Sequence, residues 1–118
     1  MPGISTHVLD NALGRPAGGV PVALWRLAGP AGAAGPGGPV LVAEAVTDAD
    51  GRVARLGEPG LPPGGYRLVF DTAAYFAAIG QQAFYPEVAV SFLAAGPDGH
   101  YHVPLLLSPF AYATYRGS

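Results

Sequence analysis

The chain has 118 residues, with six arginines, no lysine, no cysteine and eight acidic residues, which gives a formal net charge of −2. This length predicts one compact domain over residues 1–118, and half of the residues are hydrophobic, which is enough for a single core. The slightly acidic balance argues against a nucleic-acid partner, which would call for a basic patch. The missing lysine and cysteine exclude Schiff-base chemistry, a phosphate-loop lysine, disulfides, a thiolate nucleophile and a cysteine zinc site.

The N-terminal segment, residues 1–7, has neither the basic start nor the long apolar run of a signal peptide. No apolar run in the chain approaches the ~20 residues that a membrane-spanning helix needs. The sequence therefore predicts a soluble, cytoplasmic protein without a membrane partner.

Short apolar runs alternate with clusters of Gly, Pro, Asn and Asp, which is the pattern of an all-β sandwich. Loops are expected at 11–19, 57–65 and the Ala/Gly/Pro-rich segment 28–39, which predicts a flexible hairpin loop. Strands are expected at 4–10, 20–27, 40–48, 52–56, 66–71, 84–94, 100–108 and 112–116.

One helix is expected from Thr72 to about Gly80, because Asp71 or Thr72 can cap its start and Gly80 can end it. About eight strands and one short helix are arranged most economically as a β-sandwich of two packed sheets.

Two histidines stand close together in the predicted strand at 100–108. Because side chains alternate along a strand, His100 and His102 share a face with Pro104, while the residues between them face the core. Pro104 cannot donate to a ladder, which suggests an edge strand or a bulge. The two histidines could equally be solvated surface residues. A zinc site completed by His7 is a weaker alternative, because no nearby carboxylate could orient the imidazoles.

Two further side chains could carry chemistry. His7 lies in a predicted strand on the same face as Ser5, although a lone histidine in a strand is usually structural. Arg52 follows the tight turn 48–51 and could be a solvated residue at a hairpin end. A fixed guanidinium at this point could instead bind an anionic, oxygen-rich substrate.

The tail 112–118 alternates to its last residues, whereas chain ends usually fray without pattern. It could be an edge strand that simply runs to the terminus, or it could position the terminal carboxylate and the Ser118 hydroxyl. The sequence contains no Gly-x-Ser-x-Gly elbow and no glycine-rich phosphate loop. If the protein is a hydrolase, histidines that act on water are therefore the best remaining machinery.

Together these segments resemble the 5-hydroxyisourate hydrolases, a family of transthyretin-related enzymes of purine breakdown. The resemblance covers nearly the whole chain and is most specific in the histidine strand and in the terminal tetrapeptide, which transthyretin itself lacks. The chain departs from the family at Ala111 and Ala113, where Gly and Ser are common, and in the long loop 28–39. The terminal tetrapeptide is Tyr115-Arg116-Gly117-Ser118.

The resemblance implies a transthyretin-like fold of two four-stranded sheets, a homotetramer, and active sites in clefts between subunits. It gives no catalytic role to His100. The residues that it implies in catalysis are His7, Arg52, His102 and Ser118. The residues that it implies in substrate binding are His7, Arg52, Tyr115, Arg116 and Gly117.

The implied reaction is the hydrolysis of 5-hydroxyisourate to 2-oxo-4-hydroxy-4-carboxy-5-ureidoimidazoline in urate degradation. Water would attack a ring carbonyl, with His7 or His102 as general base and with no metal or organic cofactor. The sequence leaves open which histidine is the base. The alternative is a transthyretin-like protein that binds a small ligand without catalysis.

Overall fold

The computed structural model describes residues 3–27, 38–95 and 99–117, and within these ranges the chain forms nine strands and one short helix. The predicted all-β sandwich is confirmed. The strand beyond the eight expected is the two-residue β2, which lies inside the predicted loop 11–19. The elements are β1 Gly3–Asp10, β2 Arg15–Pro16, β3 Pro21–Arg26, β4 Val40–Val46, β5 Arg52–Leu56, β6 Gly64–Phe70, α1 Thr72–Ala78, β7 Val88–Ala94, β8 His100–Leu107 and β9 Tyr112–Thr114.

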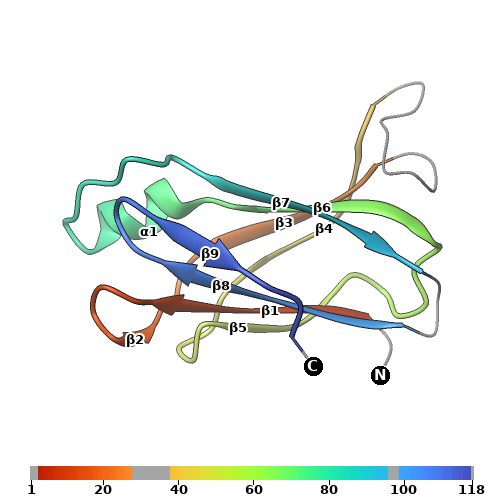
Figure 1. Cartoon of the computed structure of the whole chain (residues 1–118), viewed down its shortest axis with the longest axis horizontal. Coiled ribbons are helices and arrows are strands. Elements are labelled where there is room, and N and C mark those ends of the chain that lie inside the picture. Colours follow the sequence, from red (N-terminus) through yellow and green to blue (C-terminus); the bar gives the residue numbers. More distant parts are fainter. Residues whose placement is uncertain (1–2, 28–37, 96–98, 118) are drawn as a thin grey trace.

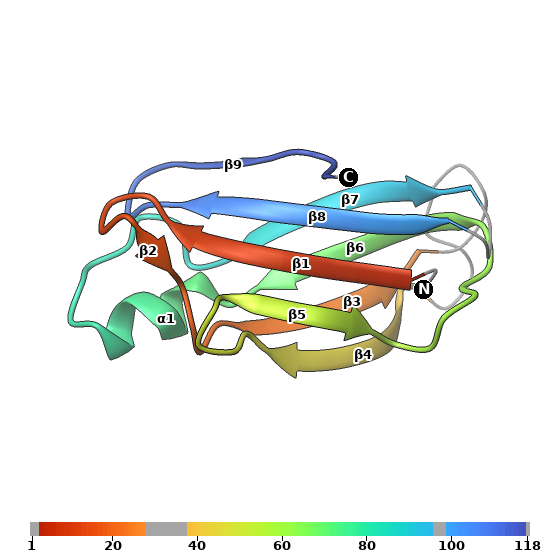
Figure 2. The same ribbon diagram turned by 90° about the horizontal axis from the view of Figure 1, so that it is seen from below.

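The strands form two packed layers (Figure 1). One sheet has the order β2-β1-β8-β9, with β5 also paired to β1, and the other has the order β4-β3-β6-β7. The first sheet therefore has five strands rather than the four that the resemblance implied, because β2 adds to its edge. Figure 2 shows β9, β8, β1 and β5 side by side, with the chain's first strand next to one of its last.

The core forms where the inward faces of the two sheets meet. In β3 and just before it, Val20, Val22 and Leu24 are all buried. In β8 the four residues of the predicted core face are buried as well, and they are Tyr101, Val103, Leu105 and Leu107. The opposite face of the five-stranded sheet is therefore left for polar side chains.

The helix begins where it was predicted to begin, at Thr72, with Asp71 as its N-cap. The Asp71 carboxylate accepts a hydrogen bond from the Ala74 backbone N–H at 3.0 Å. The last helical residue is Ala78, and Gly80 ends the helix as expected, with a φ of 71° just after the C-cap Ile79. Among the described residues, no helix has the length and apolar composition needed to cross a membrane.

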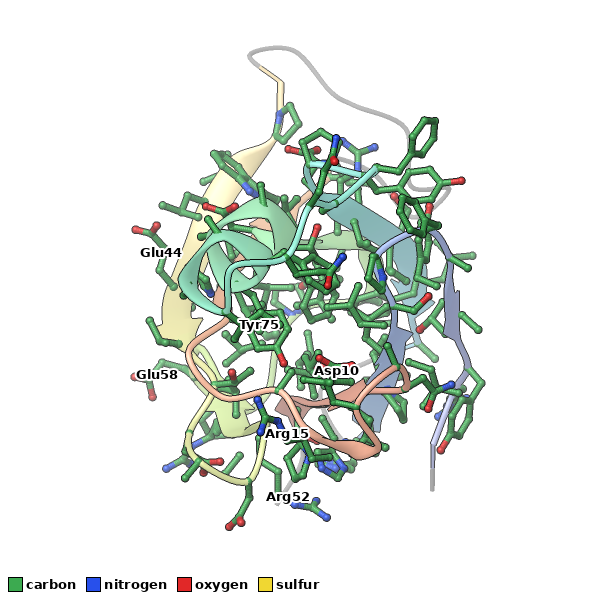
Figure 3. All side chains as sticks on the ribbon, turned by 90° about the vertical axis from the view of Figure 1, so that its left-hand side faces the viewer. Asp10, Arg15, Glu44, Arg52, Glu58 and Tyr75 are labelled. Carbon is green, nitrogen blue, oxygen red and sulfur yellow. The ribbon has the colours of Figure 1, made fainter. Side chains whose placement is uncertain are left out.

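A buried hydrogen bond joins this helix to the end of β1. The Tyr75 hydroxyl donates to the Asp10 carboxylate at 2.6 Å, and the two residues are only 4% and 1% exposed. Their side chains point toward one another in Figure 3, with Arg15 nearby. Burial, together with the hydrogen bond to Asp10, raises the pKa of Tyr75 to about 12. This contact fixes the end of β1 against the helix.

The strand expected at 84–94 begins four residues late, at Val88. The preceding segment is held by other partners: Phe84 N–H donates to the Pro109 carbonyl and Ala73 N–H donates to the Pro86 carbonyl. Pro86 also lacks the N–H that a ladder needs. These residues therefore dock on the helix and on the loop before β9 instead of extending the strand.

Smaller boundary differences have similar causes. β6 begins at Gly64 instead of at residue 66. β4 ends at Val46 instead of at residue 48, because the Thr47 N–H donates to the Val20 carbonyl. The expected hairpin loop at 28–39 lies outside the described residues except for Gly38 and Pro39.

Pro104 marks neither the expected edge strand nor a bulge, because β8 pairs with β1 on one side and with β9 on the other, and neither pairing shifts register at Pro104. The β9 ladder stops at Leu105↔Thr114 and resumes only at the isolated bridge His102↔Gly117. That register puts Pro104 in the gap, where it has no N–H to donate. The Thr114 hydroxyl spans the gap by donating to the Pro104 carbonyl at 2.7 Å.

We predict that Tyr75→Phe lowers the free energy of unfolding by about 1–3 kcal/mol, because it leaves a buried carboxylate without its hydroxyl donor. The raised pKa means that this stability is fully present below pH 10 and is lost as the pH rises toward 12. Urea unfolding at neutral pH and across that window measures both effects. Tyr112→Phe, which removes a hydroxyl from a 44% exposed ring, is the control. Equal stability of the two variants would contradict the role of the contact.

Candidate active site

The pairing of three strands gathers the predicted polar residues on the outer face of the five-stranded sheet. β1 and β8 run parallel, with Ser5 opposite His102 and His7 opposite Pro104. On its other side, β1 pairs with β5 so that His7 lies opposite Arg52. Directly paired residues share a face. The pairing therefore places His7, Arg52 and His102 on one face of the sheet, on three neighbouring strands.

The turn before β5 fixes the position of Arg52. One carboxylate oxygen of Asp48 accepts from the backbone N–H groups of Asp50 and Arg52, at 2.9 and 3.0 Å. Gly51 adopts a φ of 75°, and a Cβ at this position would collide with the Val8 carbonyl oxygen. The tight turn therefore presses against β1, and the exposed Arg52 side chain projects away from the core (Figure 3).

A hollow of about 330 Å³ lies on this face. Arg52 and His102 line it, and the sheet residues Thr6, Val53 and Ala54 complete its wall. His100, to which the resemblance gave no role, lines it as well, and so does Ser5. A guanidinium and imidazoles in one hollow can bind an oxygen-rich molecule and move a proton.

Ser5 is the site residue that the sequence analysis missed. Its hydroxyl lies 2.8 Å from Nδ1 of His102 and 3.4 Å from Nε2 of His100. Alternation along β1 already placed Ser5 on the same face as His7. Only the parallel register with β8, which joins residues 97 positions apart, shows that it touches His102.

The surroundings of His102 favour its neutral form. Desolvation is the largest cause that lowers its pKa below the ordinary 6.5, and the Arg52 charge, His7 and His100 lower it further. A neutral imidazole has a lone pair available near neutral pH, which suits a general base.

The tail reaches this site through Gly117. Its backbone N–H donates to the His102 carbonyl at 2.7 Å. A Cβ at Gly117 would lie 2.6 Å from Cδ2 of His102 and 3.3 Å from Cγ of Pro104. Glycine is therefore the residue that lets the tail pass this close to the imidazole. Ser118, which the resemblance made catalytic, lies outside the described residues.

Tyr115 and Arg116 line a different hollow from the histidines. The Arg116 guanidinium carbon lies 4.9 Å from the centre of the Tyr101 ring, which belongs to the core face of β8. The hollow has a volume of about 210 Å³ and is otherwise lined by Val90, Phe92, Leu93, Tyr101, Val103 and Thr114. Neither Tyr115 nor Arg116 lines the hollow that holds His102.

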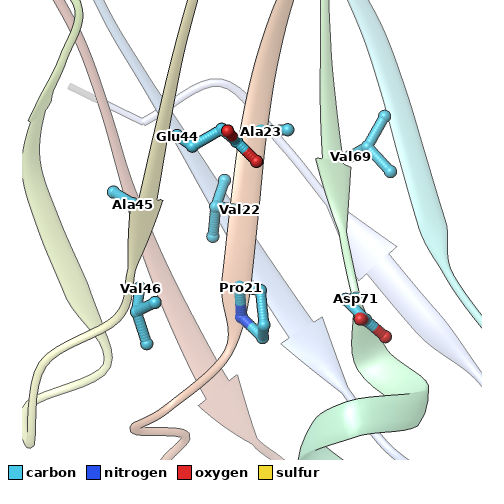
Figure 4. A pocket seen from close by; sticks show the side chains of 8 residues that line it. All are labelled: Pro21, Val22, Ala23, Glu44, Ala45, Val46, Val69 and Asp71. Atoms are coloured by element: carbon cyan, nitrogen blue, oxygen red, sulfur yellow. The ribbon is translucent and has the colours of Figure 1, made fainter.

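A larger hollow, of about 480 Å³, lies on the four-stranded sheet (Figure 4). It carries the carboxylates of Glu44 and Asp71 on an otherwise apolar wall, and no residue of the predicted site lines it. Among the described residues, no group of three or more His, Asp or Glu side chains is arranged to hold a metal ion. The three-histidine zinc alternative therefore has no support in this geometry.

Comparison with known proteins shows which family and which solved structures the chain is similar to. A model of the HIUase/Transthyretin family matches residues 4–117. The 5-hydroxyisourate hydrolase of Deinococcus radiodurans is 45% identical over 122 residues, which cover 99% of this chain and 97% of that protein. The structure of Klebsiella pneumoniae 5-hydroxyisourate hydrolase superposes with a TM-score of 0.83 at 36% identity, covering 100% and 94% of the two chains. Sea bream transthyretin in complex with thyroxine gives 0.84 at 35% identity, covering 97% and 93%.

The fold and the site define a transthyretin-like β-sandwich that carries imidazoles and a guanidinium on the outer face of one sheet. The chain belongs to the HIUase/Transthyretin family. The resemblance inferred from the histidine strand and the terminal tetrapeptide is thereby confirmed.

We predict that His102 titrates below pH 6.5, as read from its ring proton shifts by NMR. Arg52→Gln should raise this pKa, because it removes a nearby positive charge. The pKa should stay below the ordinary value, because desolvation is the larger cause. Arg67→Gln, on the other sheet, is the matched control and should leave the titration unchanged. A His102 pKa unaffected by Arg52→Gln would contradict the described electrostatics.

Proposed function

We propose that this protein hydrolyses 5-hydroxyisourate, the reaction named in its relatives from Deinococcus and Klebsiella. The observation that carries the proposal is the hollow in which a half-buried imidazole, with Nδ1 bonded to Ser5, lies beside the Arg52 guanidinium. The product would be the ring-opened compound expected from the sequence, as one step of urate degradation in the cytoplasm.

The proposed mechanism uses imidazole, guanidinium and water. Arg52 holds substrate oxygens and stabilises the negative charge that develops when water attacks a ring carbonyl. His102 takes a proton from that water as general base, an effect that typically contributes about 10²–10⁴-fold. His7, opposite Arg52 on β1, orients the water or returns a proton to the leaving nitrogen.

We further propose that the protein acts as a homotetramer, that Tyr115 and Arg116 contact the substrate bound to another subunit, and that Ser118 has the catalytic role that the resemblance implies. This arrangement is supported by the position of Tyr115 and Arg116, which line a hollow other than the one that holds His102. Exposed apolar side chains near the tail also favour a covering partner. They are Phe84 at 68% exposure, Phe110 at 66%, Leu93 at 62%, Tyr115 at 58% and Tyr112 at 44%.

A second candidate is a binding protein without catalysis, favoured by the similarity to a transthyretin solved with thyroxine. Its ligand would occupy the same polar face or a channel between subunits. Turnover separates the two candidates, because a binding protein protects or releases its ligand unchanged.

We predict that the purified protein accelerates the loss of 5-hydroxyisourate absorbance when urate oxidase generates that compound in situ. His102→Gln should lower kcat by about 10²–10⁴-fold, because glutamine cannot act as a general base. Glu44→Gln, in the larger hollow on the other sheet, should leave the rate within about twofold and serves as the control. Full activity of His102→Gln, or saturable binding without turnover in the wild type, would contradict the proposal.

We predict that Gly117→Ala lowers kcat by about tenfold or more, because the added methyl would displace the imidazole or the tail. Ala113→Ser, a small change on the exposed β9 strand of the same tail, should have little effect. Both are measured by the absorbance assay, with thermal unfolding to confirm the fold. Equal rates for Gly117→Ala and the wild type would show that the tail does not set the position of His102.

A further inference from the structure

We propose that Ser5 is a positioning residue that holds His102 with its proton on Nδ1, so that Nε2 is the basic atom of the site. The inference rests on the proposed hydrolysis and deepens it, because it assigns the general base to one histidine and to one nitrogen. No role for Ser5 followed from the histidine motif or from the terminal tetrapeptide.

The two edges of the His102 ring are both occupied. The Nδ1 edge faces β1, where the Ser5 hydroxyl lies 2.8 Å away. The opposite Cδ2 edge faces Gly117 so closely that a Cβ there would lie 2.6 Å from it. Nδ1 and Cδ2 are the two ring atoms bonded to Cγ, so Nε2 and Cε1 form the free outer end of the ring. His102 lines the hollow, and Nε2 is its one nitrogen not already bonded to Ser5.

The contact between Ser5 and Nδ1 can be formed by either neutral tautomer of His102, because a hydroxyl can donate or accept. Arg52 lines the same hollow, and its positive charge disfavours a further proton on His102. A water molecule in this hollow meets a lone pair on Nε2 only when the neutral ring carries its proton on Nδ1. The proton of the neutral ring is therefore expected on Nδ1, where the Ser5 oxygen accepts it.

Ser5 is only 8% exposed, so its own hydroxyl proton also needs an acceptor. Nε2 of His100 lies 3.4 Å from the Ser5 hydroxyl oxygen and can serve as that acceptor. The order of donors is then His102 Nδ1–H to the Ser5 oxygen, and Ser5 O–H toward His100. This contact gives His100 a supporting part that the motif did not assign to it.

The arrangement suits proton transfer, because the His102 ring does not have to rotate between its bond to Ser5 and its contact with water. As water attacks the substrate carbonyl, one water O–H bond breaks and its proton forms a bond with Nε2 of His102. The water oxygen bonds to the carbonyl carbon, and the carbonyl electron pair moves to its oxygen beside Arg52. The resulting imidazolium keeps its Nδ1–H bond to Ser5, which is stronger when the donor is charged.

The direct test is the tautomer of His102 in the folded wild-type protein, read by two-bond ¹H–¹⁵N correlation with ¹⁵N-labelled histidine above pH 7. His7→Gln and His100→Gln assign the signals of the three histidines. We expect the Nδ1–H form in the wild type and a shift toward the Nε2–H form in Ser5→Ala. An Nε2–H form in the wild type overturns the proposal without any variant.

Enzyme kinetics test what the loss of the Ser5 hydroxyl does to catalysis. Ser5→Ala should lower kcat by about ten- to a hundredfold and change KM by less than about twofold, because the base, rather than substrate binding, is disturbed. Ser5→Thr keeps the hydroxyl and should recover most of kcat. Ser91→Ala is the matched control, since that serine accepts a hydrogen bond from Arg67 on the other sheet. A Ser5→Ala enzyme with unchanged kcat, or an equal loss in Ser5→Thr, overturns the positioning role.

The two readouts separate this inference from the proposed function. A wild-type protein that hydrolyses 5-hydroxyisourate with His102 in the Nε2–H form retains the function and refutes the role of Ser5. A protein that shows the Nδ1–H form without turnover retains the hydrogen bond and refutes the assigned reaction, and with it the catalytic part of the inference.

Discussion

The parallel pairing of β1 with β8 is the constraint on which the site depends. It joins residues nearly a hundred positions apart and places Ile4, Thr6 and Val8 beside the core face of β8. A shift of this pairing by one residue would turn one strand's apolar side chains to solvent and send its polar ones into the core. The buried aliphatic side chains of the sandwich thus enforce the register that puts Ser5 beside His102.

The other features of the site follow from this register. β5 can add Arg52 to the polar face because the turn at Gly51 presses closely on β1, and Asp48 holds the Arg52 backbone in place. The tail can approach His102 because residue 117 has no side chain. Burial is the largest cause that lowers the pKa of His102, and the positive charge of Arg52 lowers it further, so that the neutral imidazole is favoured. The packing that stabilises the sandwich therefore also makes the neutral imidazole of His102 available as a base.

Much of this could be predicted from the sequence. Alternation along β8 correctly separated its core face from its histidine face, and the turn chemistry before Arg52 placed that residue at the start of a strand. The contact of Ser5 with His102 could not be predicted, because parallel pairing between distant strands leaves no local pattern. The late start of β7 was missed because residues 84–87 take their partners from the helix and from Pro109.

The measurement that tests this account most directly is the crystal structure of the protein with a hydrolysis-resistant purine analogue. The account predicts the analogue in the hollow on the five-stranded sheet, with its oxygens bonded to the Arg52 guanidinium and its reacting carbon facing Nε2 of His102. Density for the analogue in the hollow lined by Glu44 and Asp71, with the histidine hollow empty, would contradict it.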